Sequence, residues 1–232
     1  MKVVLANLSN TLYQASRFRL NESAKRFGIS NICSYDFESI KTTRFYYENE
    51  TILSQPTGLG FWLWKPYIIL ETLSRLDEGD VVIYADAGIE ILDSLDPLIK
   101  ICKDQQPIVL FGNGNLINSE WTKRDCFVLM GCDSNEYWNS VQCDASFLLF
   151  RKCNFTISFI QRWFTYCRDS RILTDVPNTC GKENLPGFIE HRRDQSVLSL
   201  LAYSSSISYF RIPTQFGNHY KAPPYRIKGE FN

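Results

Sequence analysis

Two aspartates occupy positions where a carboxylate could do chemistry. Asp86 follows the apolar run DVVIY at 80–84, which is typical of a central strand in a parallel sheet. Because ligands of parallel α/β sheets bind beyond the carboxyl ends of the strands, this carboxylate is expected at the ligand-binding edge. The small residues Ala87 and Gly88 would let a bulky ligand approach the backbone closely. The competing interpretation is a turn aspartate that accepts hydrogen bonds from neighbouring amides.

Asp194 is the second candidate. It precedes the apolar segment 197–201 at a spacing that places it on the inward-facing stripe of an expected helix. A carboxylate in this first turn either caps the helix or points into a pocket at its end. Gln195 follows it, and two arginines precede it as possible charge partners.

Two further clusters carry charge. Lys123, Arg124 and Asp125 follow an expected strand, where they could line a ligand site or form a solvated helix face. His219 and Lys221 are two residues apart near the end of the chain. An imidazole can ligate a divalent metal and an ammonium can contact a phosphate, although a solvated tail explains this pair equally well.

The elements that must position these residues alternate along the chain. Apolar runs predict strands at 2–6, 30–35, 80–84, 107–111, 145–150 and 207–212. Periodic apolar stretches predict helices at 14–27, 66–76, 95–103, 156–167 and 194–203, and the segments 7–13, 42–60 and 169–190 are expected as loops. The alternation predicts one α/β domain over residues 1–232, with a mainly parallel central sheet flanked by helices and an irregular tail at about 213–232.

Composition narrows the possible partners. Lys and Arg number 25 and Asp and Glu number 25, and this balance argues against a protein whose main partner is nucleic acid. No apolar stretch reaches the length of about 18 residues that a membrane span needs, and no secretory signal is visible. We therefore expect a soluble protein of the cytoplasm or another intracellular compartment. Eight cysteines without a C-x-x-C pair, and only two histidines, argue against a structural zinc site.

Three blocks carry a resemblance to a known family. They are GLGFWLWKPYIILETLSRLDEGDVVIYADAGIEI (58–91), WTKRD (121–125) and HRRDQS (191–196). Together they resemble a nucleotide-diphospho-sugar transferase of the GT-A fold, of the small bacterial and viral type. The resemblance implies a glycosyltransferase whose nucleotide-sugar donor lies across the carboxyl ends of the parallel strands.

The resemblance also implies roles for particular residues. Asp86 would take the place of the family's DXD aspartate beside Mn2+ or Mg2+, with His219 as a second metal ligand. Gly88 stands where the motif has its second acidic residue, so this sequence departs from the pattern. Asp194 would contact hydroxyls of the donor sugar or serve as the catalytic carboxylate, with Asp125 as reserve for the catalytic role. The remaining donor contacts implied are Asn7, Tyr13, Lys65, Ala87, Gly88, Lys123, Arg124, Gln195 and Lys221.

The expected donor is UDP-linked, and the acceptor is a hydroxyl of a glycan or of a protein-linked group. The loops 42–60 and 169–190 are candidate acceptor or lid segments, because loops on a rigid scaffold carry specificity. Inversion or retention of the anomeric centre is left open. Two alternatives stay open as well, an inactive nucleotide-sugar or carbohydrate-binding module and a nucleotidyltransferase.

Overall fold

The apolar run before Asp86 forms a fully buried strand. This strand, β3 (Val81–Ala85), pairs with β1 (Val3–Ser9) on one side and β5 (Val141–Arg151) on the other. The computed structural model describes residues 1–213, and their sheet has the strand order β2-β1-β3-β5-β4-β6. The remaining strands are β2 (Asn31–Asp36), β4 (Ile108–Ile117) and β6 (Tyr209–Arg211).

The sheet is mixed but mainly parallel. β1 runs parallel to β2 and β3, and β4 runs parallel to β6, whereas β5 is antiparallel to β3. The predicted α/β class is therefore confirmed. The direction of β5 leaves no mark in the sequence, because its buried apolar stretch 148–150 would read the same whichever way the strand ran.

Two compact units can be distinguished in the chain. The first contains Met1–Glu50, Trp64–Val109 and Ser146–Ile160, and the second contains Thr51–Leu63, Leu110–Ala145 and the chain from Gln161 onward. The extent of a single domain over residues 1–232 stays a prediction.

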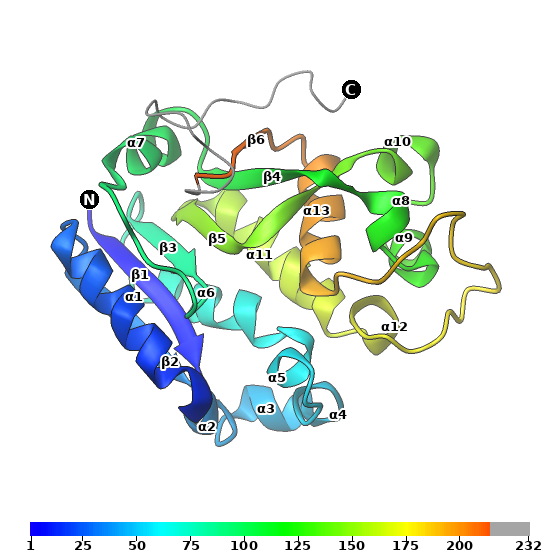
Figure 1. Cartoon of the computed structure of the whole chain (residues 1–232), viewed down its shortest axis with the longest axis horizontal. Coiled ribbons are helices and arrows are strands. Elements are labelled where there is room, and N and C mark those ends of the chain that lie inside the picture. Colours follow the sequence, from blue (N-terminus) through cyan, green and yellow to red (C-terminus); the bar gives the residue numbers. More distant parts are fainter. Residues whose placement is uncertain (214–232) are drawn as a thin grey trace. The chain divides into compact units, whose positions relative to one another are not determined.

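In the first unit, helices cover the parallel strands through apolar stripes. α1 (Gln14–Arg26) buries Leu20 and Ala24, four residues apart on one helix face, and runs alongside β1 (Figure 1). α6 (Trp64–Ser74) contacts β1 and β3 and buries Ile69 and Leu73, again four residues apart. The other helices of this unit are η1 (Thr11–Tyr13), α2 (Phe37–Ile40), α3 (Arg44–Glu48) and α7 (Asp96–Asp104).

In the second unit, α13 (Asp194–Ser204) is the most buried helix, with the whole stretch 197–202 inaccessible. It contacts α8 (Asn118–Trp121), α9 (Arg124–Leu129) and α12 (Ser170–Leu173). The unit also contains α5 (Gly58–Phe61) and α10 (Asn135–Trp138), while α4 (Glu50–Leu53) and α11 (Asn154–Cys167) span both units.

The three predicted loops are wrong in part. The segment 42–60 contains α3, α4 and most of α5, and the segment 169–190 contains α12. The expected loop 7–13 begins with the last residues of β1 and continues into η1. The helices near 50 are too short to show an apolar period, and tertiary packing stabilises them. The ring of Phe45 on α3, for example, stacks on Tyr67 of α6 with 3.9 Å between the ring centroids.

The block GLGFW adopts a conformation that the sequence did not indicate. Five consecutive residues, 58–62, have φ between 54° and 89°, so that α5 is a left-handed turn. A left-handed turn is unfavourable for the three residues here that carry a Cβ. Two features require glycine at position 60. Its φ is +89°, and a Cβ there would lie 2.5 Å from the Cα of Leu53.

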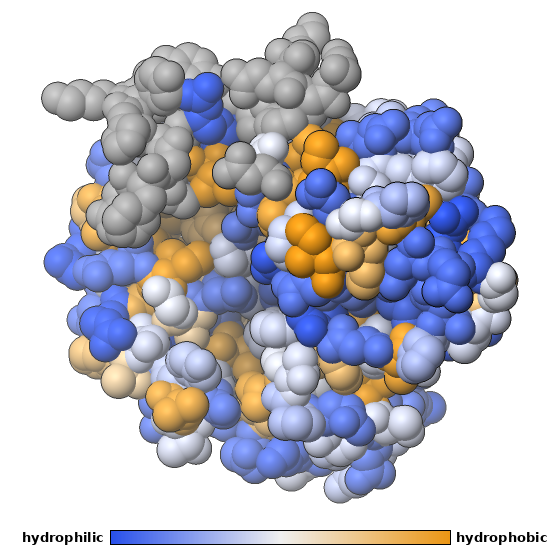
Figure 2. All heavy atoms as spheres, turned by 45° about the vertical axis from the view of Figure 1, so that its right-hand side comes forward, coloured by the Kyte–Doolittle hydropathy of each residue, from blue (hydrophilic) through white to orange (hydrophobic). Residues whose placement is uncertain are grey.

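On the face shown in Figure 2, hydrophilic residues prevail and apolar residues gather in small groups. Within residues 1–213, no helix is both long and apolar enough to cross a bilayer.

Candidate active site

The carboxyl end of β3 carries Asp86, as the sequence predicts. The backbone N–H of Asp86 donates to the carbonyl of Ser146 at 2.8 Å, which fixes the residue at the end of the β3–β5 pairing. The carboxylate is 36% exposed, and a Cβ placed on exposed Gly88 would meet no heavy atom within 4 Å. A half-exposed carboxylate therefore lies at this strand end with room beside it.

Lys65 reaches the same carboxylate from α6. Its side chain is only 3% exposed, and Nζ lies 3.7 Å from Oδ1 of Asp86 and 5.3 Å from the ring centroid of Tyr84. The Tyr84 hydroxyl donates to the same Oδ1. Asp86, Lys65 and Tyr84 thus form one hydrogen-bonded and ion-paired cluster at the end of β3.

The described residues do not fit a divalent-cation site at Asp86. A divalent cation prefers several oxygen ligands, but this strand end offers one carboxylate that already pairs with an ammonium. Within residues 1–213 no group of three or more His, Cys, Asp or Glu side chains could hold a metal ion. His219 and Lys221 lie outside the described residues.

The carboxyl end of β1 presents buried polar side chains. Asn7 and Ser9 point to the same side of the strand, since they are two residues apart, and both are 2% exposed or less. Nδ2 of Asn7 donates to Asn21 at 2.9 Å, but Oδ1 of Asn7 and Oγ of Ser9 find no hydrogen-bond partner within residues 1–213. Tyr13, the expected stacking residue, lies on η1 and is 53% exposed.

Asp194 is the first residue of α13 and is 4% exposed, so the predicted inward position is confirmed. It is not the capping residue, because Arg193 occupies the N-cap. The expected charge partners lie elsewhere, since Arg193 pairs with Asp175 at 2.8 Å and Arg192 pairs with Glu190. Nε1 of Trp163 donates to the carbonyl of Asp194 at 3.1 Å and so anchors the start of the helix.

A residue that the sequence analysis missed supports this helix start. Gln142, fully buried on β5, accepts a 2.7 Å hydrogen bond from Gln195. Its Nε2 lies 3.0 Å from Oγ of Ser196 and 3.1 Å from the carbonyl of Trp121. Its signal in the sequence was weak, because Gln142 is one of several polar residues in this strand and only its burial shows that the amide needs partners.

Lys123 and Asp125 hold the loop 174–184 in place. Nζ of Lys123 donates to the carbonyl of Val176 at 2.5 Å, and the carboxylate of Asp125 accepts the backbone N–H groups of Thr179 and Cys180, each at 2.8 Å. Asp125 is fully buried. These contacts make both residues loop-positioning groups rather than a solvated helix face.

Arg124 acts in the same way. Its backbone N–H donates to Oδ1 of Asn184 at 2.8 Å, and its guanidinium pairs with Asp133 at 3.0 Å and lies over the ring of Trp138. The guanidinium therefore supports the fold around the loop.

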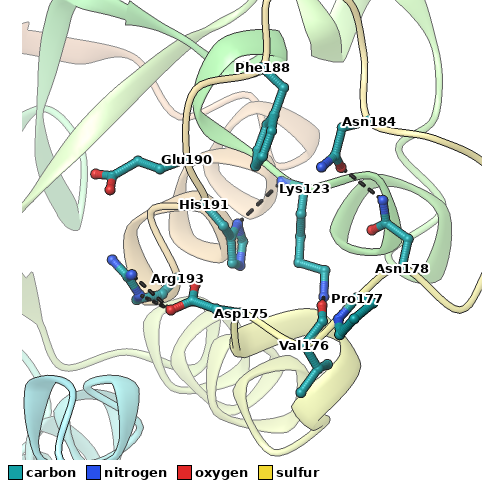
Figure 3. A pocket seen from close by; sticks show the side chains of 10 residues that line it. All are labelled: Lys123, Asp175, Val176, Pro177, Asn178, Asn184, Phe188, Glu190, His191 and Arg193. Atoms are coloured by element: carbon teal, nitrogen blue, oxygen red, sulfur yellow. Dashed lines mark hydrogen bonds and ion pairs between the residues drawn. The ribbon is translucent and has the colours of Figure 1, made fainter.

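A cavity of about 270 Å³ lies between this loop and the start of α13 (Figure 3). The ring of Phe188 points toward His191 and Lys123, and the side chain of Lys123 runs toward Val176, whereas Glu190 points away. The lining residues are Lys123, Asp175, Val176, Pro177, Asn178, Asn184, Phe188, Glu190, His191 and Arg193.

Burial sets the charge state of this cavity. It lowers the pKa of Lys123, an effect that nearby Asp125 opposes, and it lowers the pKa of His191 to about 3. For Asp125, burial works against ionisation, but the hydrogen bonds from Cys180 and Thr179 outweigh it and hold the pKa below its usual value. At neutral pH the cavity therefore contains a neutral imidazole.

Comparison with known proteins identifies the fold. No protein-family model matches the sequence, and no curated protein does. The apo structure of the bifunctional glycosyltransferase WbbM matches with a TM-score of 0.50 at 11% identity, over 88% of this chain and 38% of that chain. Mouse xyloside xylosyltransferase 1 matches with a TM-score of 0.49 at 8% identity, over 91% and 85% of the two chains.

The galactosyltransferase LgtC in complex with donor and acceptor sugar analogues matches with a TM-score of 0.38 at 15% identity, over 87% of this chain and 70% of that chain. The chain thus spans well under half the length of WbbM, the structure whose fold it matches best among these three. With its mainly parallel sheet and flanking helices, the chain has the fold of the GT-A glycosyltransferases.

Proposed function

We propose that the protein is a glycosyltransferase that moves a sugar from a nucleoside-diphosphate-sugar, with UDP as the expected nucleotide, to a hydroxyl of a glycan or protein-linked acceptor. The observation that carries this proposal is the half-exposed carboxylate of Asp86 beside open Gly88, at the carboxyl end of a central strand in this fold. Sugar and ribose hydroxyls are the groups that such a carboxylate binds by accepting hydrogen bonds.

Polar side chains at the carboxyl end of β1 favour the binding of a nucleotide there. Oδ1 of Asn7 and Oγ of Ser9 lack partners within residues 1–213, and a buried polar atom without a partner is costly unless a ligand or water satisfies it. The edge of a nucleobase offers such groups, and the exposed ring of Tyr13 offers a surface for stacking. We assign this strand end to the base.

An inverting reaction needs a carboxylate that acts on the acceptor. The acceptor hydroxyl attacks the anomeric carbon as the glycosyl–phosphate bond breaks, and in an inverting enzyme a carboxylate takes the hydroxyl proton. Asp194 is our candidate, because it lies in the first turn of α13, which Trp163 and the Gln142 network hold in place. Asp125 is unsuited to this role, since backbone donors occupy both of its oxygens.

The cavity of Figure 3 is our candidate for the acceptor sugar. Its volume of about 270 Å³ is just below the range of about 300–1,000 Å³ that drug-sized ligands occupy, so it suits one sugar ring. Its cations are already engaged within the chain, since Arg193 pairs with Asp175 and Lys123 donates to the carbonyl of Val176. A cavity with no cation left over, lined by amides and the ring of Phe188, favours a neutral saccharide over a phosphate.

Thermal shift with a panel of uridine, guanosine and thymidine diphospho-sugars tests the donor site. A true donor raises the melting temperature of the wild type by mass action, and Asp86→Asn should lose that shift. The exposed Asp104→Asn serves as the matched control and should keep it. Absence of a shift with every donor in the panel would contradict the proposal.

Turnover separates an enzyme from an inactive binding module. We expect Asp194→Asn to lower the rate of sugar transfer or donor hydrolysis about 100-fold or more while the donor still shifts the melting temperature. Release of pyrophosphate instead of a nucleoside diphosphate would indicate a nucleotidyltransferase. Donor binding with no turnover by the wild type would identify a binding module.

A further inference from the structure

We propose that Asp86 does not ligate a divalent cation, and that the ammonium of Lys65 occupies its cation-binding side, so that the donor binds without metal. The inference rests on the proposed function for the identity of the donor. Its starting observation is the 3.7 Å separation of Nζ of Lys65 from Oδ1 of Asp86.

Charge at this strand end favours an ammonium over a second cation. A metal-binding pair of carboxylates carries a charge of −2, but here Gly88 supplies no carboxylate and Lys65 compensates the one that Asp86 provides. The pair has no net charge. A divalent cation that approached Asp86 would meet the repulsion of the ammonium across a few ångströms, and the ammonium itself is 3% exposed.

Burial holds the ammonium in place. Lys65 is 3% exposed, lies in the first turn of α6 between buried Trp64 and Pro66, and contacts the ring of fully buried Tyr84. A cation over an aromatic face is stabilised further where water is excluded. Lys65 therefore cannot leave Asp86 without exposing buried groups, unlike a lysine on a surface.

The arrangement still leaves Asp86 able to bind a ligand. Lys65 and the Tyr84 hydroxyl both contact Oδ1, and the carboxylate remains 36% exposed. Oδ2 can accept a hydrogen bond from a hydroxyl of the donor's sugar or ribose. Lys65 is a positioning residue in this scheme, because it acts through Asp86.

Binding of Mn2+ alone, followed by the loss of its free electron paramagnetic resonance signal, tests the inference on the full chain. We expect the wild type and Asp86→Asn to bind Mn2+ equally, because Asp86 contributes nothing to any site. Lys65→Met keeps the apolar stem and removes the ammonium, so it should bind Mn2+ about tenfold or more tightly than the wild type. Lys65→Arg keeps the charge and should behave as the wild type.

Two results would overturn the inference. One is Mn2+ binding by the wild type that Asp86→Asn removes, since Asp86, alone or with His219, would then be a metal ligand. The other is a folded Lys65→Met variant that binds Mn2+ no more tightly than the wild type, since the ammonium would then not be the group that excludes the metal. If Lys65→Met does not fold, as judged by circular dichroism, the comparison of wild type with Asp86→Asn still decides.

Donor binding supplies a second readout. Wild-type protein should show the same thermal shift with a donor in EDTA as in Mn2+, and Lys65→Met should show a shift that depends on added Mn2+. The Mn2+ titration needs no donor, so failure of the glycosyltransferase proposal would appear separately, as a donor panel that never shifts the melting temperature.

Discussion

The imidazole of His191 links Lys123 to α12 in its neutral form. Nδ1 accepts the backbone N–H of Lys123 at 3.3 Å, so Nε2 must carry the proton that it donates to the carbonyl of Ile172 at 2.8 Å. Protonation of Nδ1 would break the first of these bonds in a fully buried setting. The hydrogen bonds and the low pKa of about 3 agree that the ring is uncharged.

Acid should therefore destabilise the protein through His191. The unfolded chain protonates this ring near pH 6.5, whereas the folded protein does so only near pH 3. The contribution of His191 to the free energy of unfolding is complete above about pH 6.5. It should be lost as the pH falls from about 6.5 to about 3, by up to about 1.4 kcal/mol per pH unit. Urea unfolding of the wild type and His191→Gln at several pH values measures this. If the free energy of unfolding fell equally steeply with pH in the two proteins, the assignment of a neutral His191 would be contradicted.

Asp125 should behave as a structural carboxylate. Asp125→Asn turns an amide toward the N–H groups of Thr179 or Cys180, and we expect a loss of about 2–4 kcal/mol in the free energy of unfolding. Because the pKa of Asp125 is lowered, the difference from the wild type should persist at neutral pH and shrink only in acid below about pH 4.

Hydrogen exchange locates the effect of that change. The amides of Thr179 and Cys180 should exchange faster in Asp125→Asn, whereas exposed Asp104→Asn should alter stability by no more than about 0.5 kcal/mol. A variant that stays as stable as the wild type but loses activity would instead make Asp125 a catalytic residue.

The strained backbone of Arg193, just before Asp194, predicts that glycine is more stable than alanine at this position, the reverse of their usual order in a helix. Arg193 has φ 52° and ψ −120°, a conformation that favours glycine. Arg193→Gly should therefore be more stable than Arg193→Ala by about 1–2 kcal/mol, since both remove the ion pair with Asp175 and only glycine relieves the strain. At exposed Lys25 on α1 the order should reverse, with alanine more stable by about 1 kcal/mol. Thermal or urea unfolding compares the four variants.

The left-handed turn of α5 makes Gly60 irreplaceable. A methyl group there would meet the Cα of Leu53 at 2.5 Å with φ at +89°, and we expect Gly60→Ala to destabilise by about 3 kcal/mol or more. Gly28 is the matched control, because its φ is +86° but a Cβ would meet nothing within 4 Å. Gly28→Ala should cost only about 1–2 kcal/mol. Equal losses at the two positions would show that close packing at Gly60 has no effect.

Much of the framework follows from local patterns in the sequence. A continuous apolar run predicts the central strand β3 and places Asp86 at its end, and the spacing of Asp194 from residues 197–201 predicts its inward position. These predictions succeed because burial on one face imposes a period on the apolar residues, and burial on both faces imposes a continuous apolar run.

Contacts between distant segments were decided only by the tertiary structure. Sequence could not show that Lys65 would lie 3.7 Å from Asp86, that Asp125 would bind the backbone of residues 179 and 180, or that Gln142 would support the start of α13. The type of a charged or amide side chain determines which hydrogen bonds it can donate or accept. Which partner satisfies it depends on how the chain packs, because burial removes the water that would otherwise serve, and only the folded chain fixes which groups replace it.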